Sequence, residues 1–396
     1  MATNHSPLTY TQETLFEQAI GGPIAALWQT RQEGFVKGTE KKKIYWCKLT
    51  NPEHKKAVLI VNGRIESSWK YQELFYDLYR QGYDVYSFDH RGQGLSDRLL
   101  SDSDMGHVYD FTDYIDDMDV VIKQHDLKQY QQCFIIAHSM GGAIATRYLQ
   151  THPEHPFTGL ILSAPMFGIN LPWYLSPIAI PVTQILSAVS PLPRYAPGHK
   201  PYFPKPFEDN PLSQSAGRYQ WFRNLYTEKP ELQVGGPSTR WVWQGLMAAK
   251  QCFLLTRQVK VPVLLVQAGN DRIVSNLAQK RFIEKLRKTN PHAALLSIEG
   301  AQHEILFETD QYRNQALDAI FRFMDDPTSS SDEKNAIRVV GDHFTAMIKE
   351  EMSLKRFTLF FILILAYTAC VCFAHLARLT RKAGSIKFPR IRSSMI

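Results

Sequence analysis

The sequence predicts an α/β fold in which helices cover both faces of a mainly parallel sheet. Short apolar runs alternate with longer segments of helical period over most of the first 326 residues, and this alternation is typical of βαβ units. The chain is 44% hydrophobic and 21% charged, a balance that excludes a disordered, collagen-like or polytopic membrane protein. Its 396 residues allow one large domain with insertions or two domains.

Six apolar runs of strand length predict buried strands, and five segments with apolar residues three and four apart predict the helices between them. The predicted strands are Ala57–Val61, Asp84–Phe88, Cys133–Ala137, Gly159–Ser163, Val263–Gln267 and Ala293–Ile298. The predicted helices are Tyr71–Gln81, Phe111–His125, Gly142–His152, Asn276–Lys288 and Gln311–Met324. Strands that are apolar throughout favour a sheet buried on both faces.

The alternation stops between Met166 and about Thr256. This segment holds 12 of the 22 prolines and four of the seven tryptophans, and so many prolines cannot continue a central strand or a long helix. We therefore predict that residues 166–256 form an inserted helical cap. Residues 1–165 and 257–326 would form the core.

The formal charge of +7 is concentrated at the C-terminus. Residues 327–396 hold 11 Lys and Arg against 5 Asp and Glu, which leaves 34 against 33 for the rest of the chain. The main domain is thus nearly neutral, and it has no basic stripe with interleaved aromatic residues. These features argue against nucleic acid as a partner.

A 21-residue stretch without Asp, Glu, Lys or Arg, residues 357–377, is long enough to cross a hydrocarbon layer of about 30 Å. We predict a C-terminal transmembrane helix there, preceded by a linker over 327–356 and followed by a basic tail over 378–396 that suits anionic headgroups. The alternative is a buried helix of a globular domain. The bracketing charges favour the membrane as a partner.

The orientation of this span is less simple to predict. The N-terminus lacks the basic and apolar regions of a secretory signal, and the basic residues after the span would place the C-terminus in the cytosol. We expect a cytoplasmic catalytic domain with a membrane-held tail. Because Met352 and the basic residues after it resemble the start of an anchor segment, the tail could also be a joined neighbouring reading frame.

The five cysteines are scattered along the chain and have no metal-ligand spacing outside the apolar stretch. They are Cys47, Cys133, Cys252, Cys370 and Cys372. The sequence predicts reduced thiols and neither a metal site nor a cofactor. It predicts no oligomeric state.

Ser139 lies in a pattern typical of a nucleophile elbow. The run Ala137-His138-Ser139-Met140-Gly141 follows a predicted strand and precedes a predicted helix, and a serine presented in so sharp a turn needs small residues two positions before and after it. Ala137 and Gly141 meet that need. The positive end of the following helix would favour negative charge near the serine. The alternative is a chance turn of small residues.

An acid and a base follow Ser139 in the order that this fold uses. Asp271 lies in the loop after the predicted strand 263–267, and His303 lies in the loop after 293–298. We predict that His303 takes the proton of Ser139 and returns it to the leaving alcohol, while Asp271 orients His303. Taken singly, each residue could be structural.

An oxyanion hole needs two backbone N–H groups. The first is predicted at Met140, directly after the serine, and the second at Arg64, in the loop after the strand 57–61. Gly63 would let that loop turn close to the site, although it could be an ordinary loop glycine. The Arg64 cation could also bind substrate by pairing with a lipid phosphate.

The sequence resembles the monoacylglycerol-lipase and lysophospholipase branch of the serine α/β hydrolases over roughly residues 10–325, and most of all the bacterial inner-membrane lysophospholipases. The motifs that carry the resemblance are Ala137–Gly141, Asn62–Glu66, Asp89–Ser96, Gly106–Val108, Ala164–Ile169, Val234–Pro237 and His303–Glu308. Many lipases have His-Gly where this chain has Asn62-Gly63. The tail from Pro327 is not part of the family pattern.

The resemblance implies an α/β-hydrolase fold and a lysophospholipid substrate at the bacterial inner membrane. The implied reaction is hydrolysis of the remaining acyl ester through an acyl-enzyme, with transfer of that chain to phosphatidylglycerol as a further implied reaction. Two alternatives remain from the residues themselves. One is a hydrolase of another ester such as a monoacylglycerol, and the other is a non-catalytic relative that binds lipid or protein.

Overall fold

Eight strands form a single sheet in the computed structural model, which describes residues 10–170, 178–189, 192–208 and 210–329. The strand order is β1-β2-β4-β3-β5-β6-β7-β8. Pairing is parallel from β4 through β8, whereas β1 with β2 and β2 with β4 are antiparallel. The predicted mainly parallel sheet is confirmed.

All six predicted strands are present, and their ends differ from the predicted ones by no more than one residue. They are β3 (Lys56–Val61), β4 (Tyr83–Phe88), β5 (Gln132–His138), β6 (Gly159–Ser163), β7 (Val263–Ala268) and β8 (Ala293–Ile298). The sequence did not predict the hairpin of β1 (Gln32–Lys37) and β2 (Lys43–Leu49). Strand β1 lies at the sheet edge and is half exposed, so it lacks the continuous apolar run that marks a buried strand.

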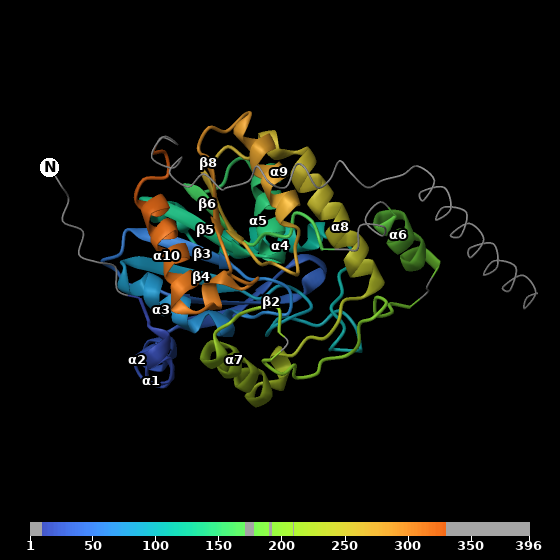
Figure 1. Cartoon of the computed structure of the whole chain (residues 1–396), viewed down its shortest axis with the longest axis horizontal. Coiled ribbons are helices and arrows are strands. Elements are labelled where there is room, and N and C mark those ends of the chain that lie inside the picture. Colours follow the sequence, from blue (N-terminus) through green and yellow to red (C-terminus); the bar gives the residue numbers. More distant parts are fainter. Residues whose placement is uncertain (1–9, 171–177, 190–191, 209, 330–396) are drawn as a thin grey trace, which may run out of the picture. The chain divides into compact units, whose positions relative to one another are not determined.

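Helices cover both faces of the sheet, as predicted (Figure 1). Helices α3 (Gln72–Arg80) and α10 (Asp310–Asp325) lie on one face. Helices α4 (Thr112–Gln124), α5 (Met140–Thr151) and α9 (Asn276–Arg287) lie on the other. Two short helices that the sequence did not predict, α1 (Phe16–Gly21) and α2 (Pro23–Gln29), precede β1, and α2 packs against α3.

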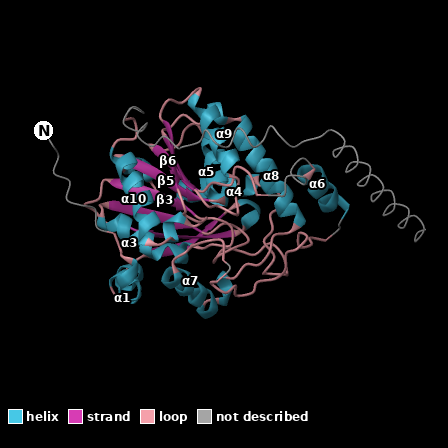
Figure 2. Cartoon of the chain, in the orientation of Figure 1, coloured by secondary structure: helices cyan, strands magenta, loops and turns pink. Residues whose placement is uncertain are grey.

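The described residues of the segment 166–256 contribute three helices and no strand of the sheet. They are α6 (Ala179–Val189), α7 (Ala216–Glu228) and α8 (Thr239–Leu254). Helix α8 is long because the prolines of this segment end at Pro237. It packs against α5 and α6, whereas α7 contacts α1. Figure 2 shows loops between α6 and α7, where most of the remaining prolines lie.

The predicted linker lies outside the described residues beyond position 329, as do the predicted span 357–377 and the basic tail. Among the helices that the structure describes, none combines the length and apolar character that crossing a membrane requires. Cys47, Cys133 and Cys252 are free and buried, and burial raises the pKa of all three thiols.

Candidate active site

Ser139 lies in a sharp turn between the end of β5 and the start of α5. Its φ of 51° and ψ of −116° are strained for a residue with a side chain. A side chain at Gly141 would collide with the carbonyl oxygen of Val61, so the turn can approach β3 only with glycine there. This is the local structure that the small residues around Ser139 predict.

His303 and Asp271 lie beside Ser139, in the loops after β8 and β7. His303 Nε2 is 3.0 Å from Ser139 Oγ, and His303 Nδ1 is 2.8 Å from Asp271 Oδ2. The other carboxylate oxygen of Asp271 accepts the N–H groups of Ile273 and Val274 at 2.7 and 3.0 Å. Parallel strands bring the three loops to one edge of the sheet, where a base can reach a hydroxyl and an acid can orient that base.

The loop after β3 presents Arg64 next to this site. Gln93 Nε2 fastens the loop by donating to the carbonyl oxygens of Gly63 and Glu66, each at 2.8 Å. Among the hydrogen bonds of the described residues, none uses the backbone N–H of Arg64 or of Met140. Both predicted oxyanion donors therefore remain available to a ligand.

A buried network of four ionisable side chains supports the loops of the site, and sequence reasoning missed it. Lys70 Nζ lies 2.9 Å from Glu66 Oε1 and 2.7 Å from Glu304 Oε1. His138 Nδ1 lies 3.0 Å from Glu66 Oε2, and its Nε2 lies 3.3 Å from the carbonyl oxygen of His303. We call Glu66, Lys70, His138 and Glu304 the buried network.

The buried network joins the loop after β3, which we call the oxyanion loop, to the loops that carry Ser139 and His303. Glu66 Oε2 accepts the Gly63 N–H at 2.5 Å, while His138 precedes Ser139 and contacts His303. Although burial opposes their charges, Lys70 and His138 lower the pKa of Glu66 well below its usual range. Burial likewise opposes the charge of His138, but Glu66 raises the pKa of His138. The i,i+4 spacing of Glu66 and Lys70 was the one sequence signal that could have suggested this network.

The side chain of Arg64 has no carboxylate partner among the described residues. Its Nη1 donates to the carbonyl oxygen of Gly235 at 3.0 Å, and its guanidinium carbon lies 5.3 Å from the ring centre of Trp241. Burial lowers the pKa of Arg64 to about 10. The structure thus places a cation beside the candidate oxyanion hole.

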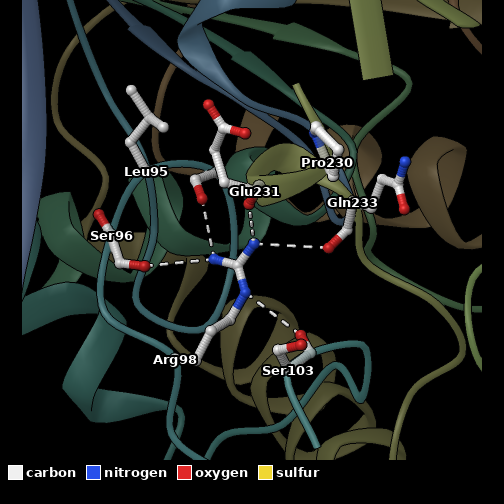
Figure 3. A pocket seen from close by; sticks show the side chains of 8 residues that line it. Leu95, Ser96, Arg98, Ser103, Pro230, Glu231 and Gln233 are labelled. Carbon is white, nitrogen blue, oxygen red and sulfur yellow. Dashed lines mark hydrogen bonds between the residues drawn. The ribbon is translucent and has the colours of Figure 1, made fainter. Parts of the chain in front are cut away.

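A separate cavity of about 280 Å³ contains none of the predicted site residues in its lining (Figure 3). Arg98 is one of the residues that line it, and this side chain donates only to backbone carbonyl oxygens. The acceptors belong to Gly94, Ser96, Ser103, Glu231 and Gln233. Arg98 therefore ties the loop after β4 to the segment 231–233. In the part of the chain that the structure describes, no cluster of His, Cys, Asp and Glu could hold a metal ion.

Comparisons with known proteins identify the family of the chain. A family model described as "Serine aminopeptidase, S33" matches residues 52–310. Lysophospholipase L2 of Escherichia coli strain K12 is 38% identical over 336 residues, which cover 82% of this chain and 96% of the relative. A probable lysophospholipase L2 of Haemophilus influenzae is 34% identical over 79% of this chain and 98% of its own.

A solved structure with the same fold is the monoacylglycerol lipase of Paleococcus ferrophilus. Its TM-score is 0.57 at 22% identity, and the match covers 72% of this chain and 99% of the other. At that identity the likeness shows the fold alone.

Proposed function

The chain belongs to the serine aminopeptidase S33 family and is a carboxylic ester hydrolase with the α/β-hydrolase fold, and from this premise we propose that it is a serine lysophospholipase. It would cleave the acyl ester of lysophospholipids through Ser139, His303 and Asp271. The observation that carries the proposal is the hydrogen-bonded chain from Asp271 through His303 to Ser139. The two lysophospholipase L2 relatives support the substrate class.

In the first half of the proposed reaction, His303 Nε2 takes the proton of Ser139 while Oγ attacks the ester carbonyl carbon. The backbone N–H groups of Met140 and Arg64 would then bind the tetrahedral oxyanion, and losing one such donor typically raises the barrier by about 3 kcal/mol. The intermediate collapses as the ester C–O bond breaks. His303 gives its proton to the leaving glycerophosphoryl alcohol, and the acyl chain stays on Ser139.

In the second half, His303 takes a proton from water while the water oxygen attacks the acyl carbon. The bond between that carbon and Ser139 Oγ then breaks, His303 returns the proton to Oγ, and a fatty acid leaves. If a hydroxyl of phosphatidylglycerol attacks in place of water, the same steps transfer the acyl chain to that lipid. Asp271 would stabilise the His303 imidazolium in both halves without taking its proton.

We also propose that the enzyme acts at the bacterial inner membrane, with the catalytic domain in the cytoplasm. The apolar stretch 357–377 and the basic residues after it support membrane attachment. The described part of the chain adds a second feature, because Val182, Ile185 and Val189 on α6 are 42%, 61% and 71% exposed. Fractionating the full chain beside a chain that ends at Asp326 tests the anchor, and equal membrane recovery would contradict it.

The activity itself is tested with a fluorophosphonate probe and with product analysis. We expect the probe to label folded protein at Ser139 and to leave Ser139→Ala unlabelled. Mass spectrometry of products from mixed lysophospholipids and monoacylglycerols should then show glycerophosphodiesters as the main alcohols. Release of glycerol alone would identify the alternative, a monoacylglycerol lipase. Absence of labelling would overturn both enzyme proposals.

A further inference from the structure

Two loops of the segment 166–256 lie against each other beside the Arg64 guanidinium. Gly235 accepts the hydrogen bond of Arg64, and Gly236 N donates to the carbonyl oxygen of Lys200 at 2.8 Å. A side chain at Gly236 would overlap His199. The loop that carries Lys205 therefore begins at Lys200, next to the glycines that contact Arg64.

Helix α7 brings a second arginine to the same loop. Arg223 Nη2 donates to Tyr219 Oη at 2.9 Å, and Tyr219 Oη donates to the carbonyl oxygen of Lys205 at 3.1 Å. One turn further along α7, Tyr226 Oη donates to the carbonyl oxygen of Ile65 at 2.9 Å. Because Arg223 and Tyr226 are three positions apart on one helix face, Arg223 lies on the side of α7 that meets the oxyanion loop.

Arg223 is a buried cation without a counter-ion. It is 8% exposed, its Nε has no hydrogen-bond partner, and no carboxylate of the described residues forms an ion pair with it. Of the four other buried arginines, Arg147 donates to the Gln150 side chain and likewise has no carboxylate partner in the described part of the chain. The other three, Arg91, Arg218 and Arg313, each pair with a carboxylate at 2.6 to 2.9 Å. The other contacts of Arg223 are with neutral side chains, since its guanidinium carbon lies 4.8 and 4.7 Å from the ring centres of Tyr219 and Phe222. A buried cation without a counter-ion is costly to a fold that gains nothing from it.

The basic side chains around Lys205 repel one another. Lys205 is exposed, but partial loss of solvent lowers its pKa, and the charges of Arg223, Arg64 and Lys200 lower it further. Burial, Arg64 and Lys205 together lower the pKa of His199. An acidic residue does lie near, but Asp104 Oδ2 accepts the backbone N–H of Tyr202 at 3.1 Å and is not among the charges that act on Lys205.

We propose that Arg64, Lys205 and Arg223 form a phosphate subsite that binds the phosphodiester of the lysophospholipid substrate. This inference rests on the proposed function and extends it to headgroup recognition. Arginine and lysine side chains bind phosphate oxygens in proteins, and this subsite would supply three of them. The monoanionic phosphodiester would supply a counter-charge to side chains that have none.

The position of Arg64 fits the covalent structure of the substrate. About six covalent bonds separate the ester carbonyl carbon from phosphorus in a 1-acyl lysophospholipid, and about six separate the backbone nitrogen of Arg64 from its guanidinium carbon. With its N–H at the oxyanion, Arg64 therefore has the length to reach the phosphate of the same molecule. A monoacylglycerol has no group at that place.

The test compares Lys205→Met and Arg223→Met with a matched control, Lys250→Met. Lys250 is exposed on α8 and takes part in no hydrogen bond or ion pair with the described residues. We expect kcat/KM for lysophosphatidylcholine to fall about tenfold in each subsite variant, mainly through KM. For the monoacylglycerol of the same chain length it should fall less than threefold. The control should match the wild type on both substrates.

Arg223→Lys keeps the charge and should recover most of the kcat/KM that Arg223→Met loses on lysophosphatidylcholine. Such a recovery would show that the missing charge, and not misfolding, causes the loss. Lys205 is exposed, so Lys205→Met tests the idea independently of Arg223. An equal loss on both substrates, or no loss on the lysophospholipid, would overturn the phosphate subsite.

Inhibition of p-nitrophenyl butyrate hydrolysis separates this inference from the proposed function. Glycerophosphocholine should compete with the ester in the wild type and compete about tenfold less well in Lys205→Met. That result would support the subsite even if the wild type cleaved no lysophospholipid, an outcome that would defeat the proposed function alone. Equal competition by inorganic phosphate would identify a free-phosphate site and overturn the headgroup assignment, as would no competition by either compound.

Discussion

The two sets of charges that flank the candidate active site differ in their partners. In the buried network every charge has an opposite charge within about 3 Å, and Lys70 has two. In the phosphate subsite Arg64, Lys205 and Arg223 have only neutral partners or each other. A partnered buried charge holds loops in place, whereas an unpartnered one is available to a ligand. The charges on one side of the oxyanion loop thus position the loops of the site, and the charges on the other side are available to bind the substrate.

Removal of Lys70 should have the strongest effect on the buried network. Lys70→Met leaves Glu66 and Glu304 as neighbouring buried carboxylates, and breaking a buried ion pair typically costs about 3–5 kcal/mol. We expect the free energy of unfolding in urea to fall by that amount. Lys250→Met serves as control, and a loss below about 1 kcal/mol would show that the network does not stabilise the fold.

Glu66→Gln should act mainly on catalysis. It removes the charge that holds His138 and the oxyanion loop while keeping the size of the side chain, and small displacements of reacting groups can cost up to about 100-fold in rate. We expect kcat for a short ester to fall between about tenfold and 100-fold with little change in KM. A change confined to KM would assign Glu66 to substrate binding instead.

The network also predicts a dependence of stability on pH. Because the pKa of His138 is raised from its ordinary value of 6.5, its contribution is complete below that value and is lost as pH rises through the folded-state pKa. The lowered pKa of Glu66 acts in the opposite direction, so its contribution is lost in acid. Stability should therefore be greatest near pH 5.5 and fall toward pH 9, by an amount on the order of 1 kcal/mol.

His138→Asn is the variant that checks the alkaline half of this curve. Without the imidazole, the free energy of unfolding measured from pH 6 to 9 should become flatter than in the wild type. An unchanged slope would assign the dependence to other groups.

Removal of a cation from the phosphate subsite should change the stability of the fold very little. Lys205→Met removes a cation that its neighbours repel, so the free energy of unfolding should stay within about 0.5 kcal/mol of the wild type or rise slightly. Urea denaturation of Lys205→Met and Lys70→Met in parallel compares how much the phosphate subsite and the buried network contribute to stability. A loss above about 1 kcal/mol would mean that Lys205 has a structural role.

The sequence predicted the parts of the molecule that rest on short-range patterns. Apolar runs located β3 to β8, and the small residues at Ala137 and Gly141 located the turn of Ser139. Asp271 and His303 could be placed because they follow strands in a fixed order. The contact of His138 with His303, in contrast, joins residues that are 165 positions apart, and no local pattern indicates such a pair.

The phosphate subsite shows the same limit. Lys205 and Arg223 lie in a proline-rich segment whose path no periodicity predicts, so their approach to Arg64 appears only in the folded chain. The hairpin of β1 and β2 was missed for a different reason, since an exposed edge strand has few apolar residues.

The contacts of Arg98 have a consequence for how this protein can vary in evolution. Its five acceptors are all backbone carbonyl oxygens, which every amino acid supplies. The side chains at Ser103, Glu231 and Gln233 can therefore change without loss of these bonds, provided that the local backbone is kept. Gly94 is constrained for another reason, because a side chain there would overlap Asp89. Arg98 itself has no such freedom, because no other side chain presents so many donors in one plane.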